Sequence, residues 1–220
     1  MKKTGLGRSA EAAAAAKTKG RPYHHGALRR ALLDAALLFL RKRDPSGLTL
    51  RALSAQVGVS AAAPYRHFSN KEALLAAVAE EGFRQMTQEM RVAEAKAAGV
   101  RERLRILGLA YIRFAKAHPE HFRIMFGREA VVYERDPSAS EAAKAAFSVL
   151  VDAVRDGQNA GLIQEGDPRS QALAAWAMVH GLAALAVDGR IAGSAEEIEP
   201  ALGYFLDGLM PSRKEHCGGD

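Results

Sequence analysis

The chain has 220 residues, 48% hydrophobic and 25% charged, enough to bury a real core in one large or two modest domains. Its single cysteine, Cys217, excludes an intrachain disulfide and suits a reducing cytoplasm. The net charge of +6 is unevenly divided: residues 1–71 contain 14 Lys/Arg and 3 Asp/Glu, and the remainder contains 17 and 22. A basic head on an acidic body indicates phosphate contacts, although five of the basic residues precede Gly20 and a solvated tail explains them as well.

The sequence predicts neither a signal peptide nor a membrane span. Residues 1–20, with the low-complexity run Ala12–Ala16, are expected to form a disordered basic extension, and residues 211–220 a flexible tail. The most apolar stretch, Ala172–Val187, is 16 residues long and contains His180, which favours a buried or interface helix. We therefore expect a cytoplasmic protein without a membrane partner.

A basic arm precedes the first expected helix. The arm, Gly20–His25, carries Arg21, which can reach a DNA minor groove, although a plain ordered linker explains the segment equally well. The helix is expected from His25 to Lys42. Arg29 and Arg30 lie near its start, where their charge opposes the helix dipole and suits an external phosphate.

The next segment predicts two short helices around a tight turn. Thr49 is placed to cap the first helix, and Gly58 lies where the chain must leave it. Ser60 is placed to cap the second helix, expected over Ser60–His67. Its first turn is Ala61–Ala63, so its backbone can approach base edges closely. This layout is typical of a helix-turn-helix whose second helix reads the DNA major groove.

A long third helix is expected to follow at once. Ser69 and Glu72 form a capping-box pattern, and the helix should run to about Ala98. Lys71 lies in its first turn, against the helix dipole, which points to an external anion such as a DNA phosphate. An ordinary three-helix cluster with a solvated lysine is the alternative.

Three motifs in this segment resemble the DNA-binding domain of TetR/AcrR-type transcriptional regulators over residues 25 to 80. They are Gly58-Val59-Ser60, Tyr65-Arg66-His67-Phe68 and Lys71-Glu72-x-Leu74-Leu75. The run WAMVHG, Trp176–Gly181, is similar to a C-terminal ligand-domain type named after its Trp-His-Gly signature. The sequence departs from the family pattern at Ser54, usually alanine, and at Pro64, which replaces a commoner apolar residue and removes a helical N–H.

Helical periodicity continues to the C-terminal region, and no run alternates as a strand would, so the expected class is all-α. One helix should end before Pro119, and a short one covers Glu120–Phe126. Capping patterns then open three more helices, at Ser138/Glu141, Asp167-Pro168 and Ser194/Glu197. We expect a three-helix DNA-binding domain over residues 21–80 and a helical ligand-binding and dimerisation domain over residues 81–210.

The resemblance implies three groups of site residues, although any single aromatic residue of the body is more simply part of the core. The DNA-binding candidates are Arg21, Arg29, Thr49, Arg51, Ser60, Ala61, Ala62, Tyr65, Arg66, His67 and Lys71. The ligand-binding candidates are Phe83, Met86, Tyr111, Phe114, Phe122, Met125, Phe126, Phe147, Trp176 and His180. The dimer-interface candidates, on the last two helices, are Ala177, Leu202, Phe205 and Leu209.

The sequence offers little for catalysis or metal binding. It has no nucleophile elbow, no phosphate loop with Lys-Ser/Thr and no HExxH motif. His118, His121 and His180 provide imidazoles, but no Cys or carboxylate motif supports a metal site. We therefore expect no catalytic residue, no cofactor and no metal.

The resemblance implies a homodimeric, ligand-responsive transcriptional regulator, a repressor that binds a pseudo-palindromic double-stranded DNA operator and is released by a small apolar or aromatic effector. Two other functions stay open. One is a helical small-molecule-binding or catalytic protein whose basic head is a generic anion surface. The other is an architectural DNA binder without sequence preference.

Overall fold

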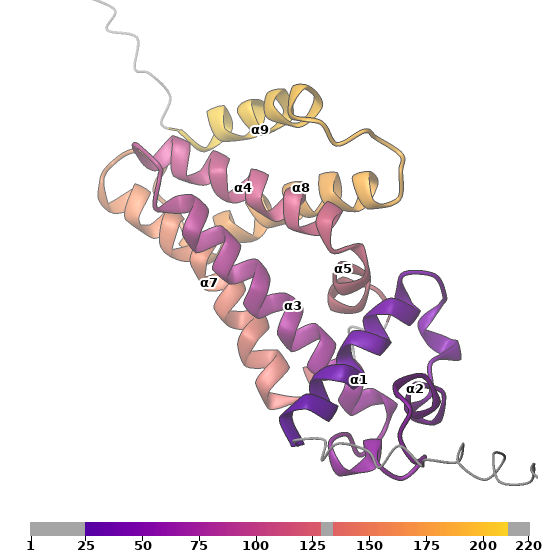
Figure 1. Ribbon diagram of the computed structural model, residues 1–220. Coiled ribbons are helices and arrows are strands. Elements are labelled where there is room, and N and C mark those ends of the chain that lie inside the picture. Colours follow the sequence, from indigo (N-terminus) through magenta and orange to yellow (C-terminus); the bar gives the residue numbers. More distant parts are fainter. Residues whose placement is uncertain (1–24, 129–133, 211–220) are drawn as a thin grey trace, which may run out of the picture.

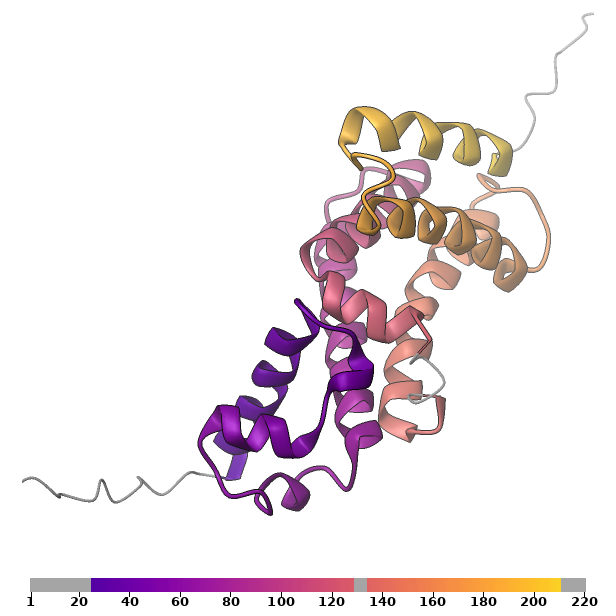
Figure 2. The ribbon, with the colours of Figure 1, turned by 90° about the vertical axis from the view of Figure 1, so that its right-hand side faces the viewer.

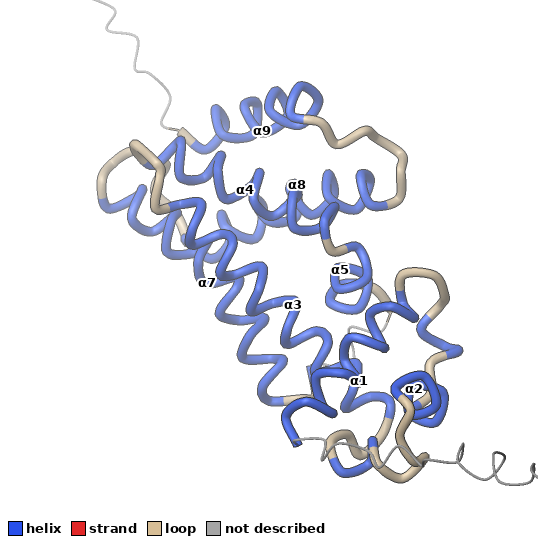
Figure 3. Tube along the Cα trace, in the orientation of Figure 1, coloured by secondary structure: helices blue, strands red, loops and turns tan. Residues whose placement is uncertain are grey.

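The computed structural model describes residues 25–128 and 134–210. Helices and short connections account for these residues, with no β-strand among them, which confirms the all-α class (Figure 3). Arg21, the 1–20 extension and the 211–220 tail lie outside the described ranges.

The N-terminal domain contains three α-helices: α1 (His25–Leu40), α2 (Leu50–Val57) and the first turns of α3 (Lys71–Glu94). Two 3-10 turns, Pro45–Gly47 and Pro64–Arg66, connect them. The helices meet at fully buried leucines, one from each: Leu32, Leu53 and Leu74. A small core of this kind fixes the three helix axes and leaves the outer faces of α2 and the turns to solvent (Figure 1).

The body is built on α3, which continues upward out of the N-terminal domain. It packs against α4 (Val100–Ala117), α5 (Pro119–Phe126) and α7 (Pro137–Asn159), and α7 lies alongside it for much of its length (Figures 1 and 2). The remaining helices, α8 (Pro168–Val187) and α9 (Ala195–Leu209), cover α4 at the far end from the N-terminal domain (Figure 1). One helix, α3, therefore belongs to both parts of the molecule.

Several helix ends begin or stop as the sequence predicts. The Thr49 hydroxyl oxygen accepts from the Ala52 N–H at 3.1 Å, and Gly58 ends α2 with a φ of 79°. The Asp167 carboxylate accepts from the Ser170 N–H at 2.9 Å, directly before Pro168. Short side-chain oxygens and a left-handed glycine supply these caps locally, so sequence is sufficient to find them.

Two predicted caps are wrong by one or two residues. Asn70, rather than Ser69, caps α3, because its side-chain oxygen accepts from the Ala73 N–H at 2.8 Å. Asp136, rather than Ser138, caps α7 through the Ala139 N–H at 3.0 Å. Asn and Asp cap at least as well as serine, so a neighbouring one competes for the position.

The expected recognition helix over Ser60–His67 is also wrong in form. Residues 61–63 form a turn and Pro64–Arg66 a 3-10 helix, closed by the His67 N–H donating to the Pro64 carbonyl at 2.9 Å. Pro64 has no N–H for an α-helical bond to Ser60, and the Ala63 N–H bonds to the Ser60 carbonyl instead. Ser60 therefore precedes a tight turn and does not cap an α-helix.

Helix α8 has the predicted bounds but is more exposed than a buried helix would be. Its most apolar 18-residue window has a mean hydropathy of 1.4 and is 22% buried, so the helix is long and apolar enough to cross a membrane by length and composition alone. A single helix of this kind is weak support for a span, and α8 packs on α4 and α7 through its buried face. Its exposed face needs another explanation.

Candidate nucleic-acid interface and ligand cavity

The outer face of the N-terminal domain carries exposed side chains of the types that read DNA. Ala61, Ala62 and Arg66 are exposed on the turn and the 3-10 helix, and the Tyr65 side chain is 58% exposed. Arg51 is exposed on α2. Within the described part of the chain, neither arginine forms an ion pair, so both charges are available to phosphates or base edges.

Two cations flank this face and are held in place by contacts within the chain. The Arg29 guanidinium lies over the Phe68 ring, 5.4 Å from its centroid. Lys71 is the first residue of α3, and its Nζ lies 3.4 Å from the Ser46 carbonyl oxygen, a long contact that leaves most of its donor capacity unused. Both side chains are oriented near the domain surface before any ligand arrives.

Other candidates have mixed surroundings. Thr49 is exposed, and its hydroxyl accepts a capping bond, which leaves its own O–H to donate to a phosphate. Ser60 is exposed and His67 is half-buried. Arg30, by contrast, is not available as expected: it pairs with Asp34 at 2.6 Å and with Glu81 at 2.9 Å. These carboxylates raise the pKa of the Arg30 guanidinium further above its usual range.

Two ion pairs connect the N-terminal domain to the body. Arg30 of α1 reaches Glu81 in the middle of α3, and Arg41, just after α1, donates its Nε–H to Glu120 of α5 at 3.0 Å. The Glu120 side chain is only 2% exposed. A shift of α5 relative to α3 would therefore change the position of α1, because both ion pairs connect to it.

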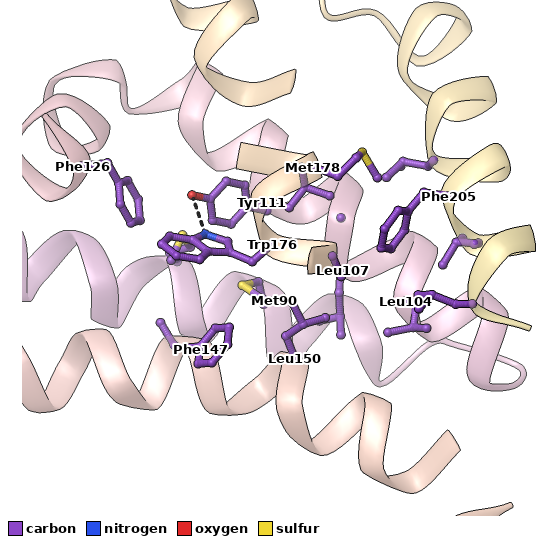
Figure 4. Close-up of a pocket in the computed structure, with 18 of the residues that line it drawn as sticks. Met90, Leu104, Leu107, Tyr111, Phe126, Phe147, Leu150, Trp176, Met178 and Phe205 are labelled. Atoms are coloured by element: carbon purple, nitrogen blue, oxygen red, sulfur yellow. Dashed lines mark hydrogen bonds between the residues drawn. The ribbon is translucent and has the colours of Figure 1, made fainter. Parts of the chain in front are cut away.

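An apolar cavity of about 130 Å³ lies in the body, between α3, α4, α5, α7, α8 and α9 (Figure 4). Its walls come from aliphatic, aromatic and thioether side chains, among them Met90, Leu107, Phe147 and Phe205. A space with this lining favours an apolar ligand.

One polar chain crosses the cavity wall. The Trp176 indole N–H donates to the Tyr111 hydroxyl oxygen at 3.2 Å, and this hydroxyl is 2.8 Å from His180 Nδ1. Because an indole N–H can only donate, Tyr111 accepts from Trp176 and can donate its proton to His180. Burial lowers the pKa of the His180 imidazole, which keeps the ring neutral. These polar groups bond to one another, and the wall facing a ligand stays largely apolar.

Of the predicted ligand-binding residues, six line the cavity and four do not. Those on the wall are Phe83, Met86, Tyr111, Phe126, Phe147 and Trp176. Phe114 and Met125 are fully buried core residues, and Met125 packs against Gly82 of α3. Phe122 and His180 lie behind the wall, stacked with ring centroids 5.3 Å apart, so they support the cavity rather than face it.

Sequence reasoning missed much of the lining because many of its members are ordinary aliphatic residues. The missed residues are Met90, Leu104, Leu107, Gly108, Ala143, Ala146, Leu150, Ala175, Met178, Val179 and Leu206. Gly108 carried a readable signal: it is a glycine on the buried stripe of an amphipathic helix. A Cβ there would lie 3.0 Å from Leu202 Cδ2 and 3.2 Å from Val179 Cγ1, which shows how closely neighbouring helices approach.

The dimer-interface residues predicted on α9 have contacts within one chain, so their role between chains stays a prediction. Leu202 is 2% exposed and packs against α4 within one chain, and Phe205 and Leu209 line the cavity. The amphipathic period identifies an apolar face but does not say which partner covers it, and here the partner is intramolecular. Ala177 is exposed on α8, as an interface residue should be.

The exposed side of α8 is apolar, whereas the exposed side of α9 also carries the acidic residues Glu196, Glu197, Glu199 and Asp207. On α8, Leu173, Ala177, Gly181 and Leu185 recur every four residues, and the two leucines are 52% and 42% exposed. On α9, Tyr204 is 81% exposed. A helix stripe that buries nothing within its own chain is typical of a surface that another protein covers.

Comparison with known families agrees with this arrangement. Residues 32–78 match the family described as bacterial regulatory proteins, tetR family, and residues 104–209 match the tetracyclin repressor-like C-terminal domain. The chain therefore belongs to the TetR family of helix-turn-helix transcription regulators. Proteins of this family are non-enzymatic DNA-binding regulators that respond to small molecules, usually as dimers. The Trp-His-Gly subtype stays a prediction.

Solved structures show the same fold. A protein with unknown function from Rhodococcus sp. RHA1 is 39% identical, with a TM-score of 0.76 over 87% of this chain and 100% of that chain. A TetR family transcription regulator from Marinobacter aquaeolei VT8 is 22% identical, with a TM-score of 0.68 over 83% and 95%. The fatty acid degradation regulator FadR from Bacillus halodurans is 19% identical, with a TM-score of 0.70 over 86% and 96%. No curated protein matches the chain.

Proposed function

We propose that this protein is a cytoplasmic, homodimeric repressor that leaves its operator when an apolar effector enters the body. The observation that carries the proposal is the pairing of an exposed, cationic helix-turn-helix face with an apolar cavity, both built partly on α3. DNA binding and effector binding then share one mechanical element, which is what linkage between two sites requires.

The dimer is proposed to form through the exposed sides of α8 and α9, centred on Ala177 and Tyr204. A stripe of small residues lets two copies of α8 approach closely, and the flanking Leu173 and Leu185 supply apolar area. Two-fold symmetry of the dimer would present two DNA-reading faces to a pseudo-palindromic operator.

The effector is proposed to be an apolar or aromatic small molecule. An apolar cavity of about 150 Å³ admits benzene, and the space of about 130 Å³ found here is close to that size, so a ligand no larger than benzene is the first to test. A longer ligand needs wall groups to move, and Met86, Met90 and Met178 are the adaptable side chains that can do so. The similarity in fold to a fatty acid degradation regulator makes an aliphatic chain the first long ligand to test.

The signal is proposed to travel through α5 as well as α3. Phe126 of α5 lines the cavity, and Glu120, on the same short helix, holds Arg41 beside the end of α1. A ligand that displaces Phe126 would shift α5, alter the Glu120–Arg41 contact and tilt the N-terminal domain. In the dimer, this tilt would change the spacing of the two DNA-reading faces and lower operator affinity.

The proposal is tested by selecting genomic fragments with the purified full-length protein. The affinities for the selected operator and for random DNA of equal length are then measured at several salt concentrations. A specific regulator should prefer the operator by about 10³-fold or more, with a specificity ratio that survives at higher salt. Equal affinity for both DNAs would favour an architectural or generic anion-binding role.

A further inference from the structure

A cluster of metal-ligating side chains lies where α4 gives way to α5. Pro119 stops α4 and starts α5, and this bend brings together His118, Glu120 and His121, whose donor atoms all lie within 4.8 Å of one another. The cluster faces the middle of α3. It is separate from the apolar cavity, because none of its three residues lines that space.

Among the residues that the structure describes, neither ring nitrogen of His121 has a hydrogen-bond partner. The residue is 3% exposed, and both nitrogens are buried without a hydrogen bond. The nearest carboxylate oxygen, Glu81 Oε1, lies 4.0 Å from His121 Nε2, beyond hydrogen-bond distance. A buried polar group without a partner is costly and uncommon, and an imidazole lone pair in this state is a ready metal ligand.

Neighbouring side chains contact the other two ligands. The Gln85 amide N–H donates to His118 Nε2 at 2.8 Å. For His118 to bind a metal through Nδ1, Nε2 must carry the ring proton and the Gln85 amide must turn so that its oxygen accepts that proton. Glu120 is 2% exposed, and one of its carboxylate oxygens accepts from Arg41 at 3.0 Å.

Charged groups of both signs lie around the cluster. Two carboxylates of α3, Glu81 and Glu89, are beside it, and Arg30 pairs with Glu81 while Arg41 pairs with Glu120 of the cluster itself. Arg43 and Arg123 line the same surface hollow as Glu120. Glu89 lies 3.7 Å from His118 Nε2 and accepts a hydrogen bond from the neutral Gln85 amide at 3.1 Å. The site therefore combines two imidazoles and a buried carboxylate.

We propose that His118, Glu120 and His121 bind a divalent transition-metal ion of the zinc, nickel or cobalt type. Imidazole and carboxylate ligands together suit these ions, whereas magnesium and calcium prefer sites made of oxygen atoms. The ion would hold α5 against α3. It would lie beside the Arg41–Glu120 contact, which connects α5 to the end of α1. The proposal does not depend on the operator or on the apolar effector.

The test uses untagged full-length protein with Co²⁺ as a spectroscopic probe and Zn²⁺ as its competitor. His24, His25, His216 and Cys217 are first replaced by alanine or serine, because these residues could bind metal elsewhere in the chain. In this background we expect one Co²⁺ per chain, with a visible absorption band that Zn²⁺ abolishes. His118→Ala and His121→Leu should each weaken binding by more than about 10- to 100-fold, the loss that second-shell changes already cause.

Two controls separate a ligand role from a structural one. His121→Leu removes two unpaired buried polar atoms, so without metal it should melt no lower than the background, and only the metal-induced rise in melting temperature should disappear. His67→Ala changes a half-buried histidine outside the cluster and should leave Co²⁺ binding unchanged. The proposal is overturned if the background binds no stoichiometric Co²⁺. It is equally overturned if His118→Ala and His121→Leu bind with the affinity of the background.

Discussion

The N-terminal domain and the body place their functional groups in opposite environments. In the N-terminal domain, the groups proposed to meet DNA are exposed side chains on short elements, and a few buried leucines hold those elements in place. In the body, the groups proposed to meet a ligand are themselves the core. A substitution can therefore abolish DNA contact at little cost in stability, whereas a substitution in the cavity changes packing and recognition together.

The exposed apolar stripe of α8 is neither a DNA-reading face nor part of the core. A substitution in this stripe should have the largest effect, because we propose that the dimer forms there. Ala177→Arg places a charge at the centre of the proposed dimer interface, where an unpaired buried charge costs about 3–5 kcal/mol. We expect monomers that no longer bind a full operator, measured by light scattering and by DNA titration.

Ala145→Arg is the matched control, because Ala145 is exposed on α7, on a different surface of the body. It should keep the mass and DNA affinity of the wild type. Wild-type mass for Ala177→Arg would move the interface away from α8.

The DNA-reading face can be tested without disturbing the core. We expect Tyr65→Ala and Lys71→Ala to weaken operator binding while the melting temperature changes little, because both side chains lie at the surface and Tyr65 is 58% exposed. If Lys71 neutralises one phosphate, its loss should make the slope of log affinity against log salt shallower by about 0.9.

Lys96→Ala is the control for charge alone. Lys96 is exposed just after the end of α3, remote in sequence from the DNA-reading face. An unchanged slope for Lys71→Ala would mean that its ammonium serves only the Ser46 contact.

The two regions also differ in how far the sequence determines them. The N-terminal domain was predictable because its signals are local: Thr49 caps α2, and Gly58 ends it with positive φ. The recognition segment was mistaken where two local signals conflicted, a capping pattern at Ser60 against the missing N–H of Pro64.

In the body, helix positions were predictable but their partners were not. The periodicity of α9 marks Leu202 and Phe205 as apolar, and only tertiary packing assigns them to α4 and the cavity rather than to a second chain. The cluster of His118, Glu120 and His121 was also not predictable as a site. Its three residues are neighbours in sequence, but the side chains that surround them come from α3 and from the end of α1.

Filling the cavity should sharpen the contrast between the regions. Ala146 is 4% exposed and lines the cavity, so Ala146→Leu adds apolar volume where a ligand would bind. We expect the affinity for indole, benzene or a medium-chain fatty acid to fall at least about tenfold, or 1.4 kcal/mol, with operator affinity preserved. Trp176, the single tryptophan, reports ligand binding by fluorescence.

Ala145→Leu, on the exposed side of the same helix, should respond as wild type. Reciprocity gives a further check, because operator must weaken effector binding by the factor by which effector weakens operator binding, about 5- to 150-fold. Ligand binding that leaves operator affinity unchanged would separate the cavity from regulation.

The smallest expected effect is the pH dependence that the cavity wall imposes on stability. Burial lowers the pKa of His180 below its ordinary value, so the unfolded chain binds this proton more readily than the folded one. Stability should therefore fall as pH decreases from about 6.5 towards the folded pKa, and level off below it.

His180→Gln retains a hydrogen-bonding group beside Tyr111 but cannot titrate, so its melting temperature should decline less over this window than that of the wild type. Since burial also lowers the pKa of His121, both proteins should keep a residual slope, and the difference between them belongs to His180. If melting temperature depends on pH equally in the wild type and in His180→Gln, His180 can be protonated in the folded protein. The contact with Tyr111 would then not require a neutral ring.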